Sequence, residues 1–468
     1  MNSCRSAEIS PAKMLCSRLS PSSFHFLPLR LLGTAASRTV GFKDAELHHT
    51  ALNFEDPSAF RVKSLGELLR ALTVFRLCSF PVLVNNCGKV LMSVARSILG
   101  GKAFSLMLRP TVYAQFVAGE NENEIARSME KMSLLGLRPM LAVPIEEDLG
   151  ESTGEKRYDD NMEIMLECVR MSHCNAWCKD PMMQLKITAL LSPELCVRPH
   201  SSSSHSATPI LNRKTTIKYC IASEASAEHN VEDLQLYLYK VRVLVDAEYT
   251  YMNPALSLIT MAMMKKYNTD GAWIWNTYQC YLKESRSLLS EALSLSKREG
   301  FCLGVKLVRG AYMDKERKLA EKEGRLDPIH QKPNISCTCS YNGCLDVMLR
   351  TISQNPERYR IIVASHNEES VRRAARRMEE LQINKDRGSV CFGQLLGMCD
   401  HVSLTLAKEG YAVYKSVPYG SVNDTIPYLV RRAQENRTVL QGIRKERDLL
   451  RREFKRHFTL PGSSLHYP

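Results

Sequence analysis

Two adjacent arginines, Arg431 and Arg432, are the residues whose types and spacing most directly suggest binding chemistry. They follow an apolar run and a Pro-Tyr-Gly turn, and we expect a helix that begins at Pro427 and carries both. Glu435 lies one helical turn from each arginine. A guanidinium fork held by a carboxylate commonly binds a second carboxylate. A solvated basic helix face is the alternative that this stretch alone leaves open.

Polar residues also follow several other β-rich runs of the chain. Taken singly they have ordinary explanations, since Lys306 could be a strand lysine that reaches solvent and Asp246 a capping acid. Together they are rich in cations and hydrogen-bond donors, which suits an anionic ligand better than a metal ion. The set comprises Lys186, Asp246, Glu248, Asn276, Tyr278, Gln279, Lys306, Arg309, His366, Asn367 and Gln394.

The elements that would position these residues form a repeating pattern of short β-rich runs and helical stretches. Eight such runs predict an α/β fold, a distorted (β/α)₈ barrel of the TIM type, with its site at the C-terminal ends of the strands. The runs are Met140–Pro144, Gln184–Thr188, Val241–Asp246, Trp273–Thr277, Gly304–Val308, Arg360–Ala364, Val390–Gly393 and Val413–Val417.

An N-terminal helical arm is expected to precede the barrel. Ser64 and Glu67 fit a capping box, and residues 64–137 are mostly helical in pattern. We therefore divide the chain into the arm at 46–137, the barrel at 138–457 and a tail at 458–468. Residues 191–235 and 325–340 break the pattern, and the sequence leaves open whether they are insertions or altered helices.

Composition excludes several classes of protein. The chain has 468 residues, 44% hydrophobic and 24% charged, which is typical of a globular protein. No apolar run approaches the roughly 20 residues needed to cross a bilayer. The net charge of +13 comes with no nucleic-acid motif, so we expect no nucleic-acid partner. The sixteen cysteines lack regular spacing and indicate free thiols, and no bound metal is expected.

Residues 1–45 have the composition of a mitochondrial targeting segment. They contain six lysines and arginines and many serines, with Glu8 as the one acidic residue before Asp44. A disordered basic tail is the alternative. The first reading predicts a mitochondrial protein.

Four longer motifs in order along the chain resemble the proline dehydrogenase family. They are GVKLVRGAY at Gly304–Tyr312, ASHN at Ala364–Asn367, FGQLLGM at Phe392–Met398 and YLVRRAQEN at Tyr428–Asn436. The resemblance extends from about residue 60 to 455. It implies an FAD-dependent barrel enzyme that oxidises a small cyclic amino acid and passes electrons to ubiquinone. It also implies peripheral contact with the matrix side of the inner mitochondrial membrane.

The resemblance assigns roles to individual positions. Asp246 and Lys306 become the catalytic residues. The residues implied for substrate binding are Lys186, Tyr312, Leu395, Ser416, Tyr428, Arg431, Arg432 and Glu435. Those implied for binding FAD are Ala247, Asn276, Lys306, Arg309, Gly310, Ala311, Ser365 and His366.

Three positions depart from the usual pattern of the family. Asn276 and Lys306 stand where glutamine and arginine are common, and the lysine lacks a bidentate fork. Ser416 stands where proline-specific relatives carry tyrosine, which would pack against the ring carbon that bears the hydroxyl in 4-hydroxyproline. The serine vacates that volume and offers a hydrogen-bonding hydroxyl.

Ser416 therefore indicates the branch of the family that oxidises trans-4-hydroxy-L-proline to 1-pyrroline-3-hydroxy-5-carboxylate. A broad-specificity proline dehydrogenase that gives 1-pyrroline-5-carboxylate is the nearest alternative. A flavin-free homologue that serves as a binding or scaffold protein is an alternative from another class.

Overall fold

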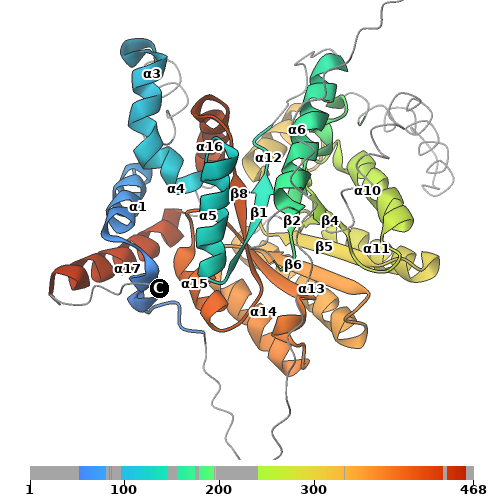
Figure 1. Ribbon diagram of the computed structural model, residues 1–468. Helices are drawn as coiled ribbons and strands as arrows, with labels where there is room; N and C mark the ends of the chain where they lie inside the picture. Colours follow the sequence, from blue (N-terminus) through green and yellow to red (C-terminus); the bar gives the residue numbers. More distant parts are fainter. Residues whose placement is uncertain are drawn as a thin grey trace, which may run out of the picture. The chain divides into compact units, whose positions relative to one another are not determined.

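Eight parallel strands form a closed barrel in the computed structural model, and each strand pairs with its neighbours in sequence (Figure 1). The structure describes residues 52–80, 96–145, 155–173, 179–193, 241–330, 333–435 and 440–459, with Val84, Asn86 and Cys196. Strand β8 pairs with β1 and closes the ring. The strands are β1 Leu137–Ala142, β2 Met182–Leu185, β3 Arg242–Val245, β4 Ile274–Gln279, β5 Leu303–Val308, β6 Tyr359–Ala364, β7 Val390–Leu395 and β8 Val413–Pro418.

The predicted barrel is confirmed, and each of the eight runs overlaps a strand. Alternate residues point into the barrel, where Met140, Leu244, Trp275 and Tyr414 form part of a small buried cluster. A Cβ on Gly304 would lie 2.4 Å from the indole ring of Trp275, so only glycine leaves room for that ring. The intervening residues face the helices and form the larger core.

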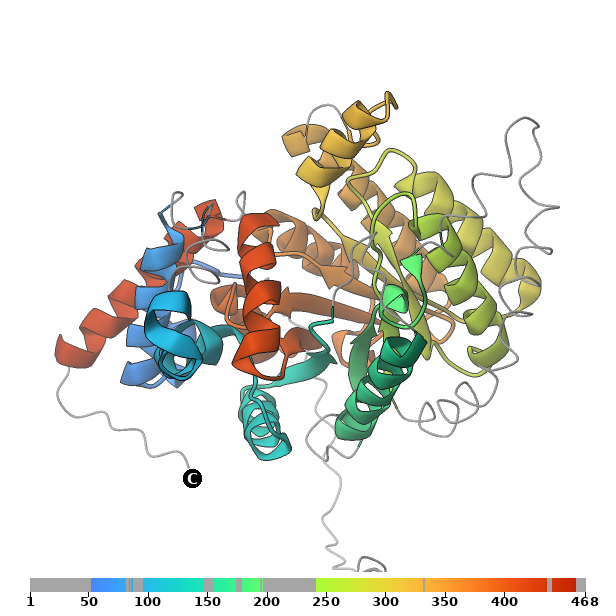
Figure 2. The same cartoon turned by 90° about the horizontal axis from the view of Figure 1, so that it is seen from above.

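Helices surround the barrel and extend from it on one side (Figure 2). The arm-side elements are η2 Pro57–Val62, α1 Leu65–Cys78, α3 Arg96–Leu108, η4 Arg109–Tyr113, α4 Ala114–Phe116 and α5 Glu122–Leu134. The elements that follow are α6 Glu155–His173, η5 Ile187–Ala189, α10 Asn253–Tyr267, α11 Ser285–Glu299, α12 Met313–Lys322, α13 Pro333–Gln354, α14 Glu368–Glu380, η6 Lys385–Arg387, α15 Asp400–Lys408, α16 Val422–Glu435 and α17 Leu440–Thr459.

The barrel departs from regular (β/α)₈ packing at its last unit. Helix α16 follows β8 but packs against α3 and η4, whereas α15 lies along β8 and β1. Helix α5, inside the predicted arm, packs against β1. The capping box at Ser64 and Glu67 forms as expected at the start of α1.

The prediction that the arginine helix begins at Pro427 is wrong. The helix begins at Val422 and contains Pro427, whose side chain is exposed. Ser421 precedes the helix and its hydroxyl accepts from the backbone N–H of Asp424, whose carboxylate in turn accepts from that hydroxyl. This local capping pattern outweighs the preference of proline for the first helical turn.

The expectation of irregular structure over 325–340 is also partly wrong. Residues 325–330 form a loop with a short bridge at Ile329, but α13 begins at Pro333 and continues to Gln354. Proline suits a first helical position, which explains this boundary. Most of the other irregular stretch, 191–235, lies outside the described residues, as do the predicted targeting segment and nearly all of the predicted tail.

Residues 113–119 join the arm to two loops at the end of the barrel. The Gln115 side chain donates to the carbonyl of Gly397 over 2.9 Å. Tyr113 donates to the carbonyl of Gly420 over 2.7 Å, and the Ala118 N–H donates to Pro418 over 2.9 Å. Gly397 has φ +73°, and a Cβ there would meet the Gln115 carbonyl oxygen at 2.0 Å, so this junction requires glycine.

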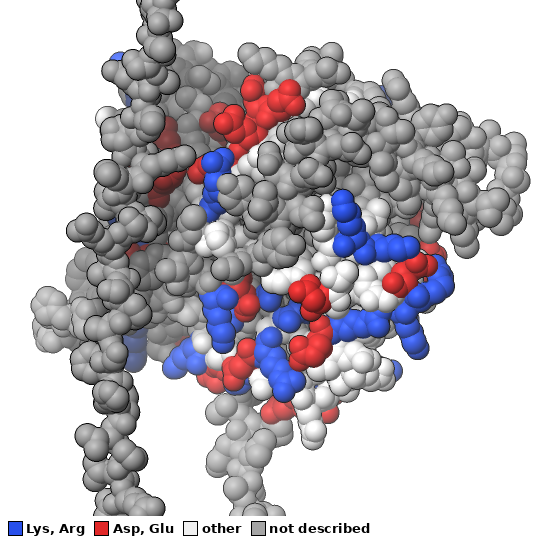
Figure 3. Space-filling model, turned by 45° about the vertical axis from the view of Figure 1, so that its right-hand side comes forward, with Lys and Arg blue, Asp and Glu red and all other residues white. Residues whose placement is uncertain are grey.

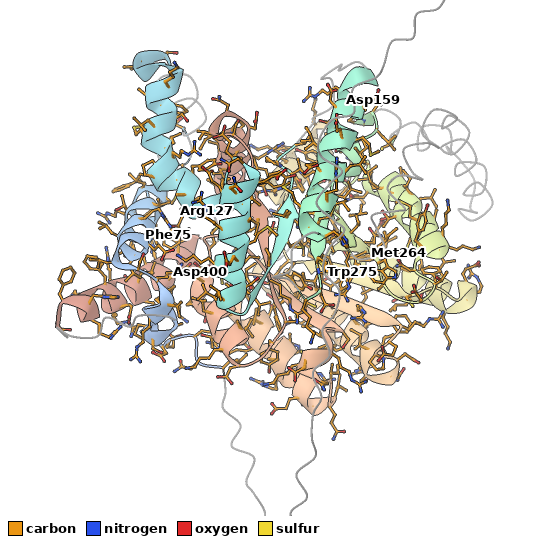
Figure 4. All side chains as sticks on the ribbon, viewed as in Figure 1. Phe75, Arg127, Asp159, Met264, Trp275 and Asp400 are labelled. Carbon is orange, nitrogen blue, oxygen red and sulfur yellow. The ribbon has the colours of Figure 1, made fainter. Side chains whose placement is uncertain are left out.

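A group of buried charges, here called the Asp400 cluster, lies on the side of the barrel where α17 packs (Figure 4). It consists of Lys63, Asp400, Lys415 and Glu446. The Asp400 carboxylate contacts the ammonium groups of Lys63 and Lys415, each over 2.8 Å. Glu446 accepts from the backbone N–H groups of Cys399 and Asp400 at the start of α15. The cluster thereby joins η2, β8, α15 and α17.

Candidate functional site

Polar residues at the C-terminal ends of strands β2, β3 and β5 lie close together, whereas Asn276 of β4 faces the helical layer. The Lys306 ammonium donates to the Asp246 carboxylate over 2.6 Å, and both side chains are mostly buried. Lys186 enters the same region from the end of β2. We call Lys186, Asp246, Glu248, Lys306 and Arg432 the mouth cluster.

Lys186 is the most strongly perturbed member of the mouth cluster. It is 8% exposed, and its pKa is lowered to about 8 because burial, and next the positive charge of Arg432, disfavour the ammonium form. Tyr428, Glu248 and Asp246 oppose this shift without cancelling it. Positive charge from two elements therefore gathers at this site, which favours an anionic ligand.

Within the mouth cluster, Glu248 is held by several hydrogen bonds. Its carboxylate accepts from the Thr188 hydroxyl at 2.7 and 2.8 Å. Burial raises the pKa of Glu248, and the bonds from Thr188 and the charge of Lys186 oppose this rise. The side chains of Asn253 and Gln279 bind its backbone. These contacts fix the loop that follows β3.

Helix α16 places the predicted substrate residues beside this cluster. The Arg432 guanidinium lies 5.1 Å from the centre of the Tyr428 ring. Arg431 is half-buried on the same helix, and the side chain of Glu435 is not among those described. Arg432 lies close enough to lower the pKa of Lys186, so two cations from different elements converge.

Ser416 lies on β8, two residues after Tyr414, and therefore shares its inward-facing side of the strand. It is 5% exposed, and its hydroxyl donates to the Gln184 side-chain oxygen on β2 over 2.6 Å. Gln184 precedes Lys186 by two residues, so both belong to one face of β2 and its continuation. Sequence reasoning missed Gln184 as a partner, although this two-residue spacing was a usable signal.

Aromatic rings line the region after β3 and β5. The Tyr312 ring lies 4.9 Å from that of Tyr249, which stacks on Tyr251 at 5.5 Å. Lys315 donates to the Tyr249 hydroxyl over 2.9 Å. Tyr312 has φ +41°, an uncommon backbone conformation for a non-glycine residue. Tyr249 was not predicted as a site residue.

Leu395 is the last residue of β7, and two side chains bind its backbone. The Leu395 N–H donates to His366 Nε2 over 3.1 Å, and its carbonyl accepts from Lys415. Burial, and next the charge of Lys415, lowers the pKa of His366 to about 3. The imidazole is therefore neutral and accepts a hydrogen bond from the loop.

Several predicted cofactor residues have hydrogen-bond partners within the fold. Asn276 faces the helical layer, where its amide donates to Ser257 of α10 over 3.3 Å. The Ser365 hydroxyl accepts from the N–H of Asn367. Arg309 donates to Thr338 of α13 over 2.6 Å. Ala247, Gly310 and Ala311 follow β3 and β5, near the charged pair that those strands carry.

Neither a metal site nor a membrane-spanning helix is found among the described residues. No group of three or more histidines, cysteines, aspartates or glutamates among them is arranged to hold a metal ion. Within the same residues, no helix is both long and apolar enough to span a bilayer.

Comparisons with known proteins show which proteins this chain is similar to. A family model described as proline dehydrogenase matches residues 125–445. A hydroxyproline dehydrogenase of Xenopus laevis is 54% identical, over 87% of this chain and 90% of that protein. The human hydroxyproline dehydrogenase is 45% identical, over 87% and 94%. The human proline dehydrogenase 1, mitochondrial, is 30% identical, over 88% and 90%.

Among solved structures, the chain is similar to proline utilization A from Bdellovibrio bacteriovorus inactivated by N-propargylglycine. The TM-score is 0.59 at 20% identity, over 81% of this chain and 37% of that one. This likeness supports the barrel fold.

Proposed function

Because the chain belongs to the proline dehydrogenase family, we propose that it oxidises trans-4-hydroxy-L-proline at the ring C–N bond. The product is 1-pyrroline-3-hydroxy-5-carboxylate. The observation that carries the choice of substrate is Ser416, a small polar residue buried on the inner face of β8. Its hydroxyl is paired with Gln184, so a substrate hydroxyl would find a polar partner there.

The mouth cluster supports an amino acid as the substrate. Lys186, Arg431 and Arg432 supply the charge that would bind its carboxylate. A hydrogen bond to a charged group contributes about 1.5–3 kcal/mol. Tyr312, Leu395 and Tyr428 would pack against the substrate ring. Glu435 would orient the arginines. The arrangement binds the substrate by its carboxylate and leaves the ring to determine selectivity.

We further propose FAD as the cofactor, which would supply the redox chemistry at this site. The residues that would hold it are those around the end of β5. Lys306 and Arg309 are cationic, and Gly310 is exposed, where a Cβ would contact only the Met313 sulfur at 3.5 Å. A backbone that is open here permits close approach of a large anionic ligand. Ala247, Ala311, Ser365 and His366 would complete the site, whereas Asn276 would have to turn away from Ser257 to reach it.

The residues of this chain would then position the substrate and its proton. Asp246 holds Lys306 in place through their 2.6 Å contact. The substrate amine must be neutral so that its lone pair can assist the departure of hydride from the adjacent carbon. Glu248 is bonded to Thr188 and buried, and His366 is committed to Leu395. We therefore assign acceptance of the amine proton to water.

We place the enzyme in the mitochondrion, on the matrix side of the inner membrane, with ubiquinone as the electron acceptor. The basic composition of residues 1–45 supports this compartment. The name of one relative, proline dehydrogenase 1, mitochondrial, agrees with it.

The test is flavin absorbance and steady-state kinetics with hydroxyproline and proline under identical conditions. We expect a yellow protein whose flavin is bleached by hydroxyproline, with the higher kcat/KM for that substrate. Equal or better efficiency with proline would instead indicate a broad-specificity proline dehydrogenase. A colourless, folded preparation would indicate a flavin-free homologue.

Replacing Ser416 by tyrosine tests the residue that carries the proposal. The tyrosine fills the space beside Gln184, so we expect hydroxyproline efficiency to fall more than proline efficiency. Pocket discrimination of this kind is worth about 1–3 kcal/mol, or roughly 10- to 200-fold. Ser290→Tyr, at an exposed position on α11, is a control for added bulk. Unchanged selectivity in Ser416→Tyr would mean that Ser416 does not determine the substrate preference.

A further inference from the structure

The segment Leu68–Gly119 differs in charge from the rest of the chain. Its 52 residues contain six lysines and arginines and no aspartate or glutamate, although the whole chain has 50 acidic residues. A stretch of this length would contain about five acids at the average density of the chain. The segment itself supplies no acid, although its Arg70 and Arg109 pair with Glu67, Glu120 and Glu124 just beyond its two ends.

The same segment also exposes apolar side chains. Of the twelve large hydrophobic residues exposed among the described residues, six lie in it: Leu69, Leu77, Phe80, Ile98, Leu106 and Met107. Scattered exposed hydrophobic residues are ordinary, but half of them in one acid-free segment is a concentration. By contrast, the face drawn in Figure 3 shows basic and acidic side chains interspersed on its described part.

Helix α3 shows how this surface is built. Phe104 and Leu108 are 2% and 3% exposed and pack with Val422 and Ile426 of α16. Leu106 and Met107 are 76% and 46% exposed, so they point away from that contact. Figures 1 and 2 show α3 beside α16. One side of α3 is thus fixed to the helix that carries Arg431 and Arg432.

The exposed side of α3 combines an apolar stripe with a lysine. Ala103, Leu106 and Met107 are spaced i, i+3, i+4 and form one stripe after the break at Gly100. Lys102 is exposed and lies four residues before Leu106, beside the stripe. A short apolar stripe flanked by lysine, without acids, matches a bilayer interface that carries anionic headgroups.

We infer that the outer face of α3, formed by Ala103, Leu106 and Met107 with Lys102, is the surface through which this protein contacts an anionic lipid bilayer. The contact is peripheral, since the stripe covers little more than one helical turn. Its biological use rests on the proposed function, in which electrons leave for a lipid-soluble quinone. Because α3 packs on α16, the lipid surface would lie next to the helix that closes the candidate site.

Helix α17 is the competing surface, because it is also rich in basic residues. Its charges are largely engaged within the protein: Arg456 pairs with Glu453, and Lys445 pairs with Glu368. Arg447 donates to Ser79 over 2.9 Å. A helix whose cations already have carboxylate or hydroxyl partners gains less from anionic lipid than one without neighbouring acids.

The test is flotation with phosphatidylcholine vesicles that contain or lack cardiolipin. We expect the wild-type chain to bind the vesicles that contain cardiolipin. Leu106→Ser with Met107→Ser should reduce the bound fraction at least tenfold, and Lys102→Ala about fivefold. Leu288→Ser on α11 and Lys455→Ala on α17, both at exposed positions, are the matched controls and should bind as wild type. Since residues 1–45 are basic, the variants are compared both in the full chain and in the chain that begins at Glu46.

Turnover measured with a water-soluble dye as the electron acceptor separates this inference from the proposed function. The α3 variants should keep wild-type turnover with the dye and lose it with quinone embedded in vesicles. Vesicle binding needs no substrate, so it can be measured even if the proposed reaction is wrong. Wild-type binding by the α3 variants, or an equal loss in Lys455→Ala, would overturn the inference. A smaller oligomer with unchanged vesicle binding would also overturn it and would make α3 a contact between copies.

Discussion

Two clusters of buried lysines and carboxylates in this protein shift the pKa of a lysine in opposite directions. In the Asp400 cluster, burial alone would lower the pKa of Lys63, but Asp400 outweighs burial and raises it. In the mouth cluster, burial and Arg432 lower the pKa of Lys186 to about 8. One lysine is stabilised as a cation by the protein, and the other is held charged at a cost.

The groups around Lys415 and those around Lys186 differ in charge. The Lys415 ammonium has three acceptors, namely Asp400 at 2.8 Å and the carbonyls of Met398 and Leu395 at 2.7 and 3.1 Å. An ammonium has three donors, so Lys415 is satisfied within the fold. The mouth cluster instead brings Lys186 towards a second cation, Arg432. The comparison teaches that a satisfied cluster joins elements, whereas an excess of positive charge prepares a site for an anion.

Removing a carboxylate from the satisfied cluster should have the largest effect on folding. In Asp400→Asn, Lys63 and Lys415 lose their common counter-charge while the shape of the side chain is kept. We expect a loss of about 3–5 kcal/mol in the free energy of unfolding, measured by urea denaturation. The two lysines hold the pKa of Asp400 well below its ordinary value, so this stability is present above the unfolded pKa and is lost as the pH falls through the folded pKa.

Glu321→Gln provides the control for Asp400→Asn, because Glu321 is exposed on α12. It should change the stability by less than about 0.5 kcal/mol. If Asp400→Asn were equally mild, the two clusters would not differ in the way proposed.

Removing a cation from the mouth should affect binding more than folding. Arg432→Met takes away a fork that would bind the substrate carboxylate. We expect KM to rise by about 10- to 150-fold, from the roughly 1.5–3 kcal/mol of a charged hydrogen bond, with little change in the melting midpoint. Arg432→Lys should lie between wild type and Arg432→Met, because charge remains without bidentate geometry.

The control for Arg432→Met is Arg376→Met on the exposed side of α14. It should leave KM unchanged. A melting midpoint that falls in Arg432→Met as far as in Asp400→Asn would contradict the distinction between the clusters.

The sequence was sufficient for the barrel because parallel strands are buried on both faces and therefore form short apolar runs. It also located Asp246 and Lys306, since residues that follow parallel strands gather at one end. The start of α16 is encoded locally by Ser421 and Asp424, and this pair outweighs the signal from Pro427.

The Asp400 cluster could not be predicted. Lys63 and Asp400 are 337 positions apart, and no local pattern pairs a lysine with one carboxylate among many. Lys415 lies in a strand pattern that is mostly apolar, and only the packing of α15 and α17 shows why a lysine is tolerated there. Partner choice depends on tertiary structure, whereas the position of each element depends on local periodicity.

Replacing Lys186 should give the smallest and most diagnostic effect. The folded pKa of Lys186 is about 8 against an ordinary 10.5, so below pH 8 the protein bears the full cost of its charge. Lys186→Met removes that cost, and we expect a melting midpoint about 2 °C higher at neutral pH, together with weaker substrate binding. Between pH 8 and 10.5 the unfolded chain holds the extra proton, so wild-type stability rises with pH relative to the variant and the difference closes. Melting curves of both proteins across this range provide the measurement, and a constant difference would mean that Lys186 is compensated within the fold, as Lys415 is.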